Sequence, residues 1–178
     1  AMIFQEPMTS LNPVFTIGNQ LDEVIFIHNP GATKEMARNR SLEMLKLVGI
    51  AAPERVYNSY PHELSGGMRK RVAIARAIVG NPEYLFCDEP NSGLDPQTSI
   101  LIDNLIKEIT EEYNITTIVN THDMNSVMGI GEHIIFIHEG NLAWEGTRHT
   151  ITQTSNQELN DFMFNNELTK LLKASAQK

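Results

Sequence analysis

Short apolar runs that alternate with helical patterns constrain the fold of this chain more than any other feature. The runs lie at residues 84–87, 116–119 and 134–137 and are rich in β-branched and large apolar side chains. They alternate with helical patterns at 68–79 and 98–112. Strands that alternate with helices predict an α/β fold with a mainly parallel sheet. Apolar residues on consecutive positions predict strands that are covered on both faces.

The first third of the chain predicts a helical subdomain. A short apolar run at 2–4 predicts a strand, and a loop containing prolines follows it. Apolar residues at helical spacing predict one helix over 16–28. Thr33 is placed to cap a second helix that ends at Gly49.

The last part of the chain predicts a hairpin followed by a helical tail. The turn residues 139–141 separate two apolar segments, which predicts a hairpin at one edge of the sheet. Residues 147–172 predict a helical tail whose apolar side consists of Leu159, Phe162, Met163 and Leu168.

The composition excludes several classes of protein. The formal net charge of −8 disfavours broad non-specific binding to nucleic acid or to an anionic membrane. The single cysteine, Cys87, excludes an intramolecular disulfide and fits a reducing compartment. No run of eighteen apolar residues is present to span a bilayer. These properties are typical of a globular domain in the cytosol.

A serine followed by two glycines opens the helix predicted at 68–79. Ser65 is a suitable N-cap, and Gly66 and Gly67 allow backbone amides to approach a phosphate at the helix N-terminus. The helix also carries the most basic stretch of the chain, Arg69, Lys70, Arg71 and Arg76. The pattern therefore predicts an anion site, although an ordinary capped helix with a solvated face explains these residues equally well.

Acidic residues at the end of the strand 84–87 indicate phosphate chemistry. Asp88 is of the type that holds Mg²⁺, and Glu89 is of the type that orients or deprotonates an attacking water. His122 follows the next strand, where α/β folds place ligands, and its imidazole is placed to contact a γ-phosphate. Gln5 follows the first strand, and its amide is placed to contact Mg²⁺ or water. The alternative is a pair of solvated acids and a structural histidine.

Five motifs in this order resemble the ATP-binding-cassette (ABC) ATPases, the motor subunits of ABC transporters. The motifs are FQEP at 4–7, LSGGM at 64–68, LFCDEP at 85–90, GLD at 93–95 and THD at 121–123. The resemblance covers the whole chain. It implies a P-loop NTPase-like α/β fold with flanking helices and an α-helical subdomain, and it implies ATP and Mg²⁺ as the bound species.

The resemblance also implies a role for each motif residue. Gln5 is similar to the Q-loop glutamine, and Asp88 is similar to the Walker B aspartate. The resemblance implies that both residues bind Mg²⁺. Glu89 is similar to the catalytic glutamate and His122 to the switch histidine. The signature, Ser65, Gly66 and Gly67, closes on the ATP of a partner subunit, and Asp95 is the D-loop aspartate.

One element of the family is missing from the sequence. No G-x-x-x-x-G-K-[ST] phosphate loop occurs among the 178 residues, so the chain resembles the C-terminal portion of a cassette. We expect this stretch to be inactive by itself, although the intact protein is expected to be an ATP hydrolase. The resemblance predicts the end of the first core segment with the Q-loop at 1–15, a helical signature subdomain at 16–80, the catalytic core at 81–146 and a helical tail at 147–178.

Two subfamilies are similar to different parts of the chain. Residues 4–21 and the run YPHELS at 60–65 resemble the peptide and nickel importers, whereas 122–147 is more similar to the cassettes of phospholipid-trafficking (Mla-type) systems. The first resemblance predicts the ATPase of a dipeptide, oligopeptide or nickel importer. The second leaves phospholipid trafficking as an alternative function.

The family resemblance also predicts partners. It implies a second ATPase subunit packed head to tail, transmembrane permease subunits, and a location on the inner face of the cell membrane. DNA-repair and chromosome ATPases share the signature, but they carry long heptad coiled coils that residues 16–65 lack. We therefore expect no nucleic-acid partner. A non-catalytic fragment that acts only as an interaction module is the remaining alternative.

Overall fold

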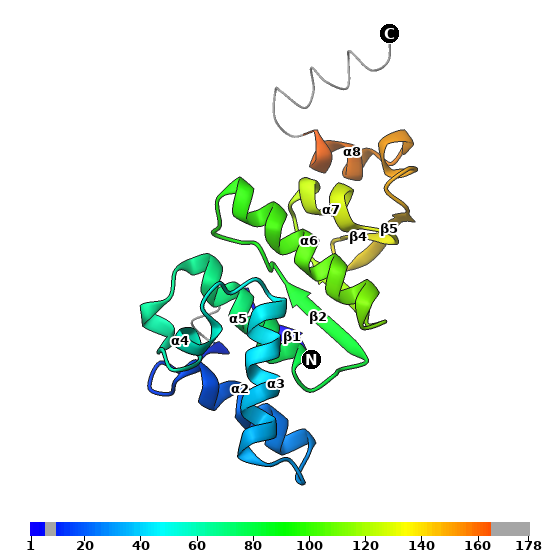
Figure 1. The fold of residues 1–178 in the computed structure, drawn as a ribbon. Coiled ribbons are helices and arrows are strands. Elements are labelled where there is room, and N and C mark those ends of the chain that lie inside the picture. Colours follow the sequence, from blue (N-terminus) through cyan, green and yellow to red (C-terminus); the bar gives the residue numbers. More distant parts are fainter. Residues whose placement is uncertain (6–9, 165–178) are drawn as a thin grey trace. The chain divides into compact units, whose positions relative to one another are not determined.

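The computed structural model describes residues 1–5 and 10–164, which belong to two compact units (Figure 1). The first unit spans Ala1–His122, and the second begins at Asp123. The first unit contains, in chain order, β1 (Met2–Ile3), α2 (Ile17–His28), α3 (Lys34–Leu47), α4 (Pro53–Tyr57), η1 (Pro61–Glu63), α5 (Gly66–Ile78), β2 (Tyr84–Asp88), α6 (Pro96–Glu112) and β3 (Thr116–Asn120).

The three strands of the first unit form one parallel sheet. Their order is β1-β2-β3, so β2 is central. Ile3 is opposite Cys87, which is opposite Val119 on the next strand. Each crossover between these strands contains helices, as expected for parallel pairing. The predicted parallel sheet is therefore confirmed.

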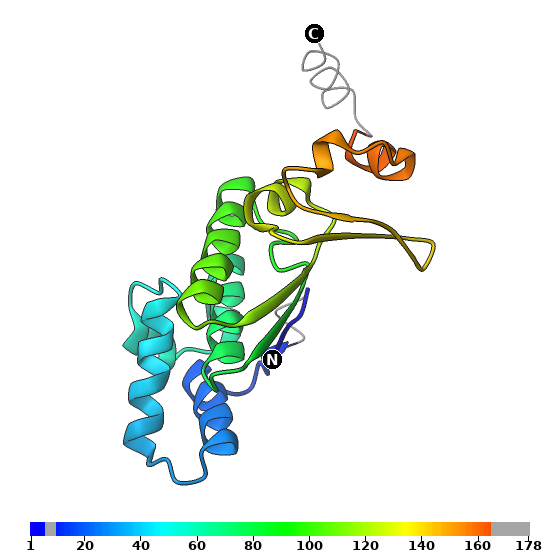
Figure 2. The same cartoon turned by 90° about the vertical axis from the view of Figure 1, so that its right-hand side faces the viewer.

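The two faces of this sheet differ in burial. Leu85 and Cys87 point to the face on which α5 and α6 pack, and they are almost fully buried. The intervening residue Phe86 is 46% exposed and Ile118 is 52% exposed. Figure 2 shows both helices on one side of β2. The prediction that these runs are covered on both faces is wrong for the described residues, because α5 and α6 shield only alternate side chains.

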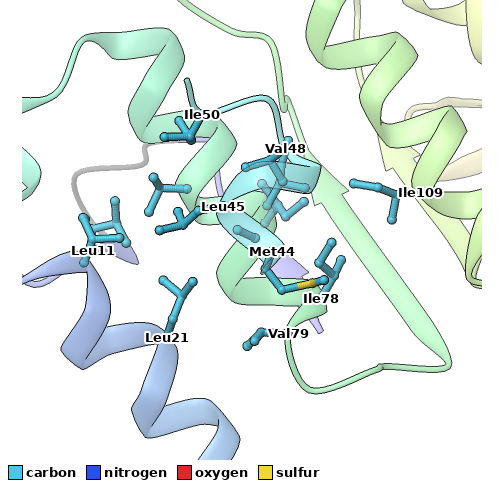
Figure 3. Packing of buried hydrophobic residues seen from close by; sticks show 14 of the residues in the cluster. Leu11, Leu21, Met44, Leu45, Val48, Ile50, Ile78, Val79 and Ile109 are labelled. Carbon is cyan, nitrogen blue, oxygen red and sulfur yellow. The ribbon is translucent and has the colours of Figure 1, made fainter. Parts of the chain in front are cut away.

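Helices α2 to α5 occupy the residues for which the sequence predicts a helical subdomain. Thr16 and Thr33 accept hydrogen bonds from amides in the first turns of α2 and α3, which fixes the start of each helix. Apolar side chains of α2, α3 and α5 then meet in a common core, which Figure 3 shows around Leu21, Met44 and Leu45. Burial of these side chains contributes on the order of 2 kcal/mol each to stability.

The second unit contains α7 (Met124–Ile130), β4 (Ile134–His138), β5 (Asn141–Gly146), η2 (Ile151–Gln153) and α8 (Gln157–Met163). The two strands form the predicted antiparallel hairpin. Its turn places Glu139 at φ 49° and Gly140 at φ 77°, as in two-residue hairpin loops. The run 134–137 therefore belongs to a separate two-stranded sheet. Its prediction as a strand of the parallel sheet is wrong because the tight turn supplies a local antiparallel partner.

The tail is interrupted rather than continuous in its described part. The Asn156 side chain accepts a hydrogen bond of 2.8 Å from the Leu159 amide, so a new helix, α8, begins there. Leu159 and Met163 are buried beside Trp144, which confirms these positions as apolar packing residues. Leu168 lies outside the described residues. Within the described ranges, no helix combines the length and the apolar character needed to cross a bilayer.

Candidate functional site

Polar residues follow the three parallel strands at the same edge of the sheet. Gln5 lies two residues after β1, Asp88 ends β2 with Glu89 next to it, and His122 lies two residues after β3. Parallel strands end at one edge, so the topology brings together residues that are far apart in sequence. The structure therefore places four of the predicted site residues on one side of the sheet.

Glu89 is the centre of this edge. Its carboxylate Oε1 accepts a 3.1 Å hydrogen bond from the His122 amide and lies 2.6 Å from the His122 Nδ1. Its Oε2 accepts a longer bond, 3.4 Å, from the Thr121 hydroxyl. The Glu89 side chain is 14% exposed, whereas the His122 side chain is 76% exposed. A shielded carboxylate therefore contacts an imidazole that is open to an incoming ligand.

Asp88 and Gln5 provide oxygen atoms of the type that Mg²⁺ prefers. The Asp88 Oδ1 accepts a 2.8 Å hydrogen bond from the Asn120 side chain, and the other carboxylate oxygen remains available to a ligand. The Gln5 amide nitrogen lies 3.5 Å from the Ser92 hydroxyl, which orients its carbonyl oxygen. Carboxylate, amide and hydroxyl oxygens fit a hard cation that keeps several waters and takes further ligands from a phosphate. Among the described residues, no group of three or more acidic, histidine or cysteine side chains is arranged to hold a metal ion.

The signature forms the beginning of α5. The Ser65 hydroxyl accepts a 3.3 Å hydrogen bond from the Met68 amide, which confirms the predicted cap. A side chain on Gly67 would place its Cβ 3.0 Å from the Thr98 methyl group of α6. Glycine at this position therefore permits the close approach of α5 and α6.

Asp95 caps the neighbouring helix α6. Its Oδ1 accepts bonds of 3.1 Å from the Gln97 amide and 3.0 Å from the Thr98 amide, and its Oδ2 accepts one of 2.5 Å from the Thr98 hydroxyl. The Thr98 hydroxyl and amide lower the pKa of this exposed carboxyl. Thr98 thus binds Asp95 and leaves no room for a side chain at Gly67, so the start of α6 lies close to the start of α5.

The basic stretch of α5 has a different use from the predicted anion site. Arg69 donates to the Leu64 carbonyl at 2.9 Å, Arg71 donates to the Gly49 carbonyl at 3.0 Å, and Arg76 donates to the Ser10 carbonyl at 2.6 Å. These guanidinium groups therefore hydrogen-bond the backbone of loops that pack against α5. A charge pattern alone does not distinguish this use from a solvated or phosphate-binding face.

Two residues that contribute to the site were not predicted from the sequence. Lys70 is 2% exposed and donates to backbone carbonyls at the strand edge. Asn120 ends β3 and orients Asp88. A signal for Asn120 was available, because it is a polar residue at the carboxyl end of an apolar strand. Nothing in the sequence separates Lys70 from the arginines on either side of it.

Comparison with known proteins agrees with this geometry. The family model described as ABC transporter matches residues 1–92. The chain belongs to the ABC transporter family. Among solved structures, a dimeric ABC cassette in a post-hydrolysis state bound to ADP and Pi matches with a TM-score of 0.70 and 35% identity, covering 83% of this chain and 62% of the other. The predicted ABC cassette fold is thereby confirmed.

Curated relatives of this ABC family member are named for peptide transport. The oligopeptide transport ATP-binding protein OppD of Bacillus subtilis is 42% identical over 146 residues, which is 82% of this chain and 40% of the relative. The dipeptide transport ATP-binding protein DppD of Haemophilus influenzae is 42% identical over 170 residues, which is 91% of this chain and 51% of the relative. The chain thus spans about half the length of these relatives or less. They support the predicted peptide-importer resemblance, and the phospholipid-trafficking resemblance is not confirmed.

Proposed function

We propose that this chain forms the signature and catalytic portion of the ATP-hydrolysing subunit of a dipeptide or oligopeptide importer. The observation that carries the proposal is the contact between the Glu89 Oε1 and the His122 Nδ1 at the carboxyl edge of a parallel sheet. The names of the peptide-transport relatives support the substrate class. The phospholipid alternative rests on the resemblance of residues 122–147 alone, and no relative named above supports it.

Glu89 is the proposed general base. Its Oε1 is contacted by the His122 amide and by the His122 Nδ1, whereas the contact of its Oε2 within the described part of the chain is the longer 3.4 Å bond from Thr121. The Oε2 lone pairs are therefore available to orient an attacking water and to accept its proton. The low exposure of the carboxylate limits competition from bulk water.

His122 is the proposed sensor of the γ-phosphate. Its side chain is 76% exposed and its Nδ1 contacts the Glu89 Oε1, so the ring is oriented by Glu89 and accessible to a ligand. In the proposed cycle Nε2 donates to a γ-phosphate oxygen while Glu89 keeps the ring oriented. Loss of the phosphate removes that bond, which makes the position of His122 sensitive to the nucleotide.

Asp88 and Gln5 are the proposed holders of Mg²⁺. When bound, Mg²⁺ neutralises charge that develops on the transferred phosphoryl group. The Asn120 bond keeps the Asp88 carboxylate at the strand end. The Ser92 contact does the same for Gln5.

The proposed function includes a second ATPase subunit, which packs head to tail against this one. Ser65, Gly66 and Gly67 present backbone amides at an exposed helix start, where the helix dipole favours a phosphate of the partner subunit. Asp95 lies beside them and is proposed to contact the partner at the same interface. The dimeric state named for the matching solved cassettes supports this arrangement. Permease partners and a location on the cytoplasmic face of the membrane complete the proposal.

The proposed functional segments follow the roles of their residues. They are the Q-loop segment at 1–15, the signature subdomain at 16–80, the catalytic core at 81–146 and the tail at 147–178. The helices α2 to α5 of the second segment share one core, which supports its treatment as a subdomain.

Titration with Mg-ATP tests the proposal. The chain is assayed alone and after joining to an upstream segment that supplies a G-x-x-x-x-G-K-[ST] phosphate loop. We expect weak binding by the chain alone, and binding with hydrolysis by the joined protein. Hydrolysis that required no residue of the strand edge, or a joined protein that bound no nucleotide, would contradict the assignment.

A further inference from the structure

Lys70 is a buried cation on the signature helix. It is 2% exposed, and the residues one turn further along α5, Ala73 and Ile74, are also buried. A buried ammonium group is costly unless it is hydrogen-bonded. Its position on the inner face of α5 therefore depends on the acceptors that it meets.

Two backbone carbonyls at the strand edge accept hydrogen bonds from Lys70. The Lys70 Nζ donates to the Gln5 carbonyl and lies 3.4 Å from the Glu89 carbonyl. Gln5 follows β1 and Glu89 follows β2, so one ammonium group joins the ends of two neighbouring strands. Arg71, the next residue on the helix, instead donates to the Gly49 carbonyl of the helical subdomain.

Glu89 has a backbone conformation that requires support. Its φ is 45°, in the left-handed region that costs a non-glycine residue on the order of 1 kcal/mol. Its amide donates to the Asn120 carbonyl at 2.9 Å, and its carbonyl accepts from the Ser92 amide at 3.1 Å and from Lys70. The same residue presents its carboxylate to His122, so support of this backbone also supports the site.

We propose that Lys70 is a positioning residue for ATP hydrolysis, which holds the Gln5 and Glu89 backbones in a fixed relation to the signature helix. Its contact with the proposed base is to the Glu89 backbone carbonyl, so Lys70 is proposed to act through Glu89. The inference rests on the proposed function for its catalytic consequence. Ser65 and Lys70 lie at the start of the same helix, α5. We therefore expect a displacement of the signature to be transmitted along α5 and through the Lys70 hydrogen bond to the Glu89 carbonyl.

Amide hydrogen exchange in the 178-residue chain tests the structural part directly. Lys70→Met keeps the length of the side chain and removes its donor. We expect exchange of the Ser92 and His122 amides, which donate to Glu89, to become about 10-fold faster, as for the loss of one hydrogen bond to a charged group. The Val79 amide at the end of α5 serves as an internal reference and is expected to keep its exchange rate.

Arg71→Met is the matched control. It removes a carbonyl-binding cation from the adjacent position, and we expect faster exchange at Ile50, next to its acceptor Gly49, and no change at Ser92. Equal exchange at Ser92 in both variants would overturn the inference. If Lys70→Met does not fold, Lys70→Gln carries the same test, because it retains an N–H donor with a shorter reach and is expected to give an intermediate rate at Ser92.

Kinetics of the joined ATPase test the catalytic part. We expect Lys70→Met to lower kcat by roughly 10- to 100-fold and to change KM for Mg-ATP by less than about threefold, because a misplaced base slows the reaction without removing a nucleotide contact. A rise in KM at unchanged kcat would overturn the inference. A joined protein without hydrolysis would refute the proposed function but would leave the exchange result at Ser92 as an independent test of the Lys70 contact.

Discussion

Two carboxylates in the first unit have similar hydrogen-bonding partners and different surroundings. Asp22 on α2 accepts a 2.6 Å bond from the Ser41 hydroxyl of α3 and a 2.5 Å bond from the Tyr57 hydroxyl of α4. Glu89 accepts from the Thr121 hydroxyl and from His122. Ser41 is completely buried, whereas the side chain of His122 is 76% exposed.

The surroundings decide what each carboxylate does. Burial, followed by the hydrogen bond to Asp22, raises the pKa of Tyr57 to about 12, so the phenol remains a donor at physiological pH. The Arg38 guanidinium lies 4.6 Å from the centre of the Tyr57 ring and covers one face of it. Asp22 therefore joins three helices, although Asp22 and Tyr57 also line an open pocket on the helical subdomain. Glu89 instead lies at the carboxyl edge of the parallel sheet and contacts an exposed histidine, which is the arrangement expected of a catalytic carboxylate.

The largest expected effect is on the rate of ATP hydrolysis. Glu89→Gln removes the proposed base and should lower kcat of the joined ATPase by roughly 10²- to 10⁴-fold while Mg-ATP binding remains. The thermal midpoint should change little, because the amide retains one oxygen acceptor for His122. Glu83→Gln, at the exposed opposite end of β2, is the control and should hydrolyse ATP normally. An equal loss of kcat in Glu89→Gln and Glu83→Gln would contradict the assignment of Glu89 as the base.

The second effect is on stability and should appear in the helical subdomain. Asp22→Ala leaves the Ser41 and Tyr57 hydroxyls without their acceptor, which costs about 1–3 kcal/mol at the buried Ser41 and less at the half-buried Tyr57. Urea unfolding of the 178-residue chain measures this loss. Asp22→Asn retains an acceptor oxygen and should lose less, and Glu23→Ala on the exposed side of α2 should lose almost nothing. If Asp22→Ala lowers the free energy of unfolding no more than Glu23→Ala does, the hydrogen bonds of Asp22 do not stabilise the packing of the three helices.

The smallest effect concerns Cys87, which is a buried residue of β2. Burial raises the pKa of its thiol from 9.0 to about 12, so little thiolate is available at about pH 8. Alkylation by iodoacetamide, followed by mass spectrometry, should be slow in the native chain and fast in urea. Rapid native alkylation would show that the strand edge opens readily.

The same pKa shift gives a pH dependence with a defined sign. The thiol contributes its full stability below pH 9.0 and loses it as the pH rises towards about 12, because the unfolded chain releases the proton first. The urea midpoint should therefore fall over this range by more in the native sequence than in Cys87→Ala.

Local chemistry explains why many elements were predictable from the sequence. Thr33 and Ser65 precede apolar periodic segments, and each caps its helix as expected. The hairpin at 139–141 follows from a short turn between apolar runs. Each of these signals depends on residues that are within about four positions of one another, so their energetics are contained in the sequence pattern.

Long-range contacts explain the predictions that were wrong. Apolar residues on consecutive positions of β2 indicate burial on both faces, but Phe86 is exposed because α5 and α6 pack against one face of the described sheet. The run at 134–137 has the pattern of a parallel strand, but its partner is the adjacent β5. Which partner covers a strand is decided by packing between distant segments, and apolar periodicity does not contain that information.

The sequence by itself determined the order of the motifs, the helix starts and the residue types at the strand ends, because these depend on local hydrogen bonding and side-chain chemistry. Only the tertiary structure decided which of two similar carboxylates connects three helices and which contacts an exposed histidine at the carboxyl edge of the parallel sheet. It also decided that Lys70, one of four basic residues on α5, is buried against the Gln5 and Glu89 carbonyls. The physical reason is that burial and access to solvent arise from contacts between segments 19 and 65 residues apart in the chain.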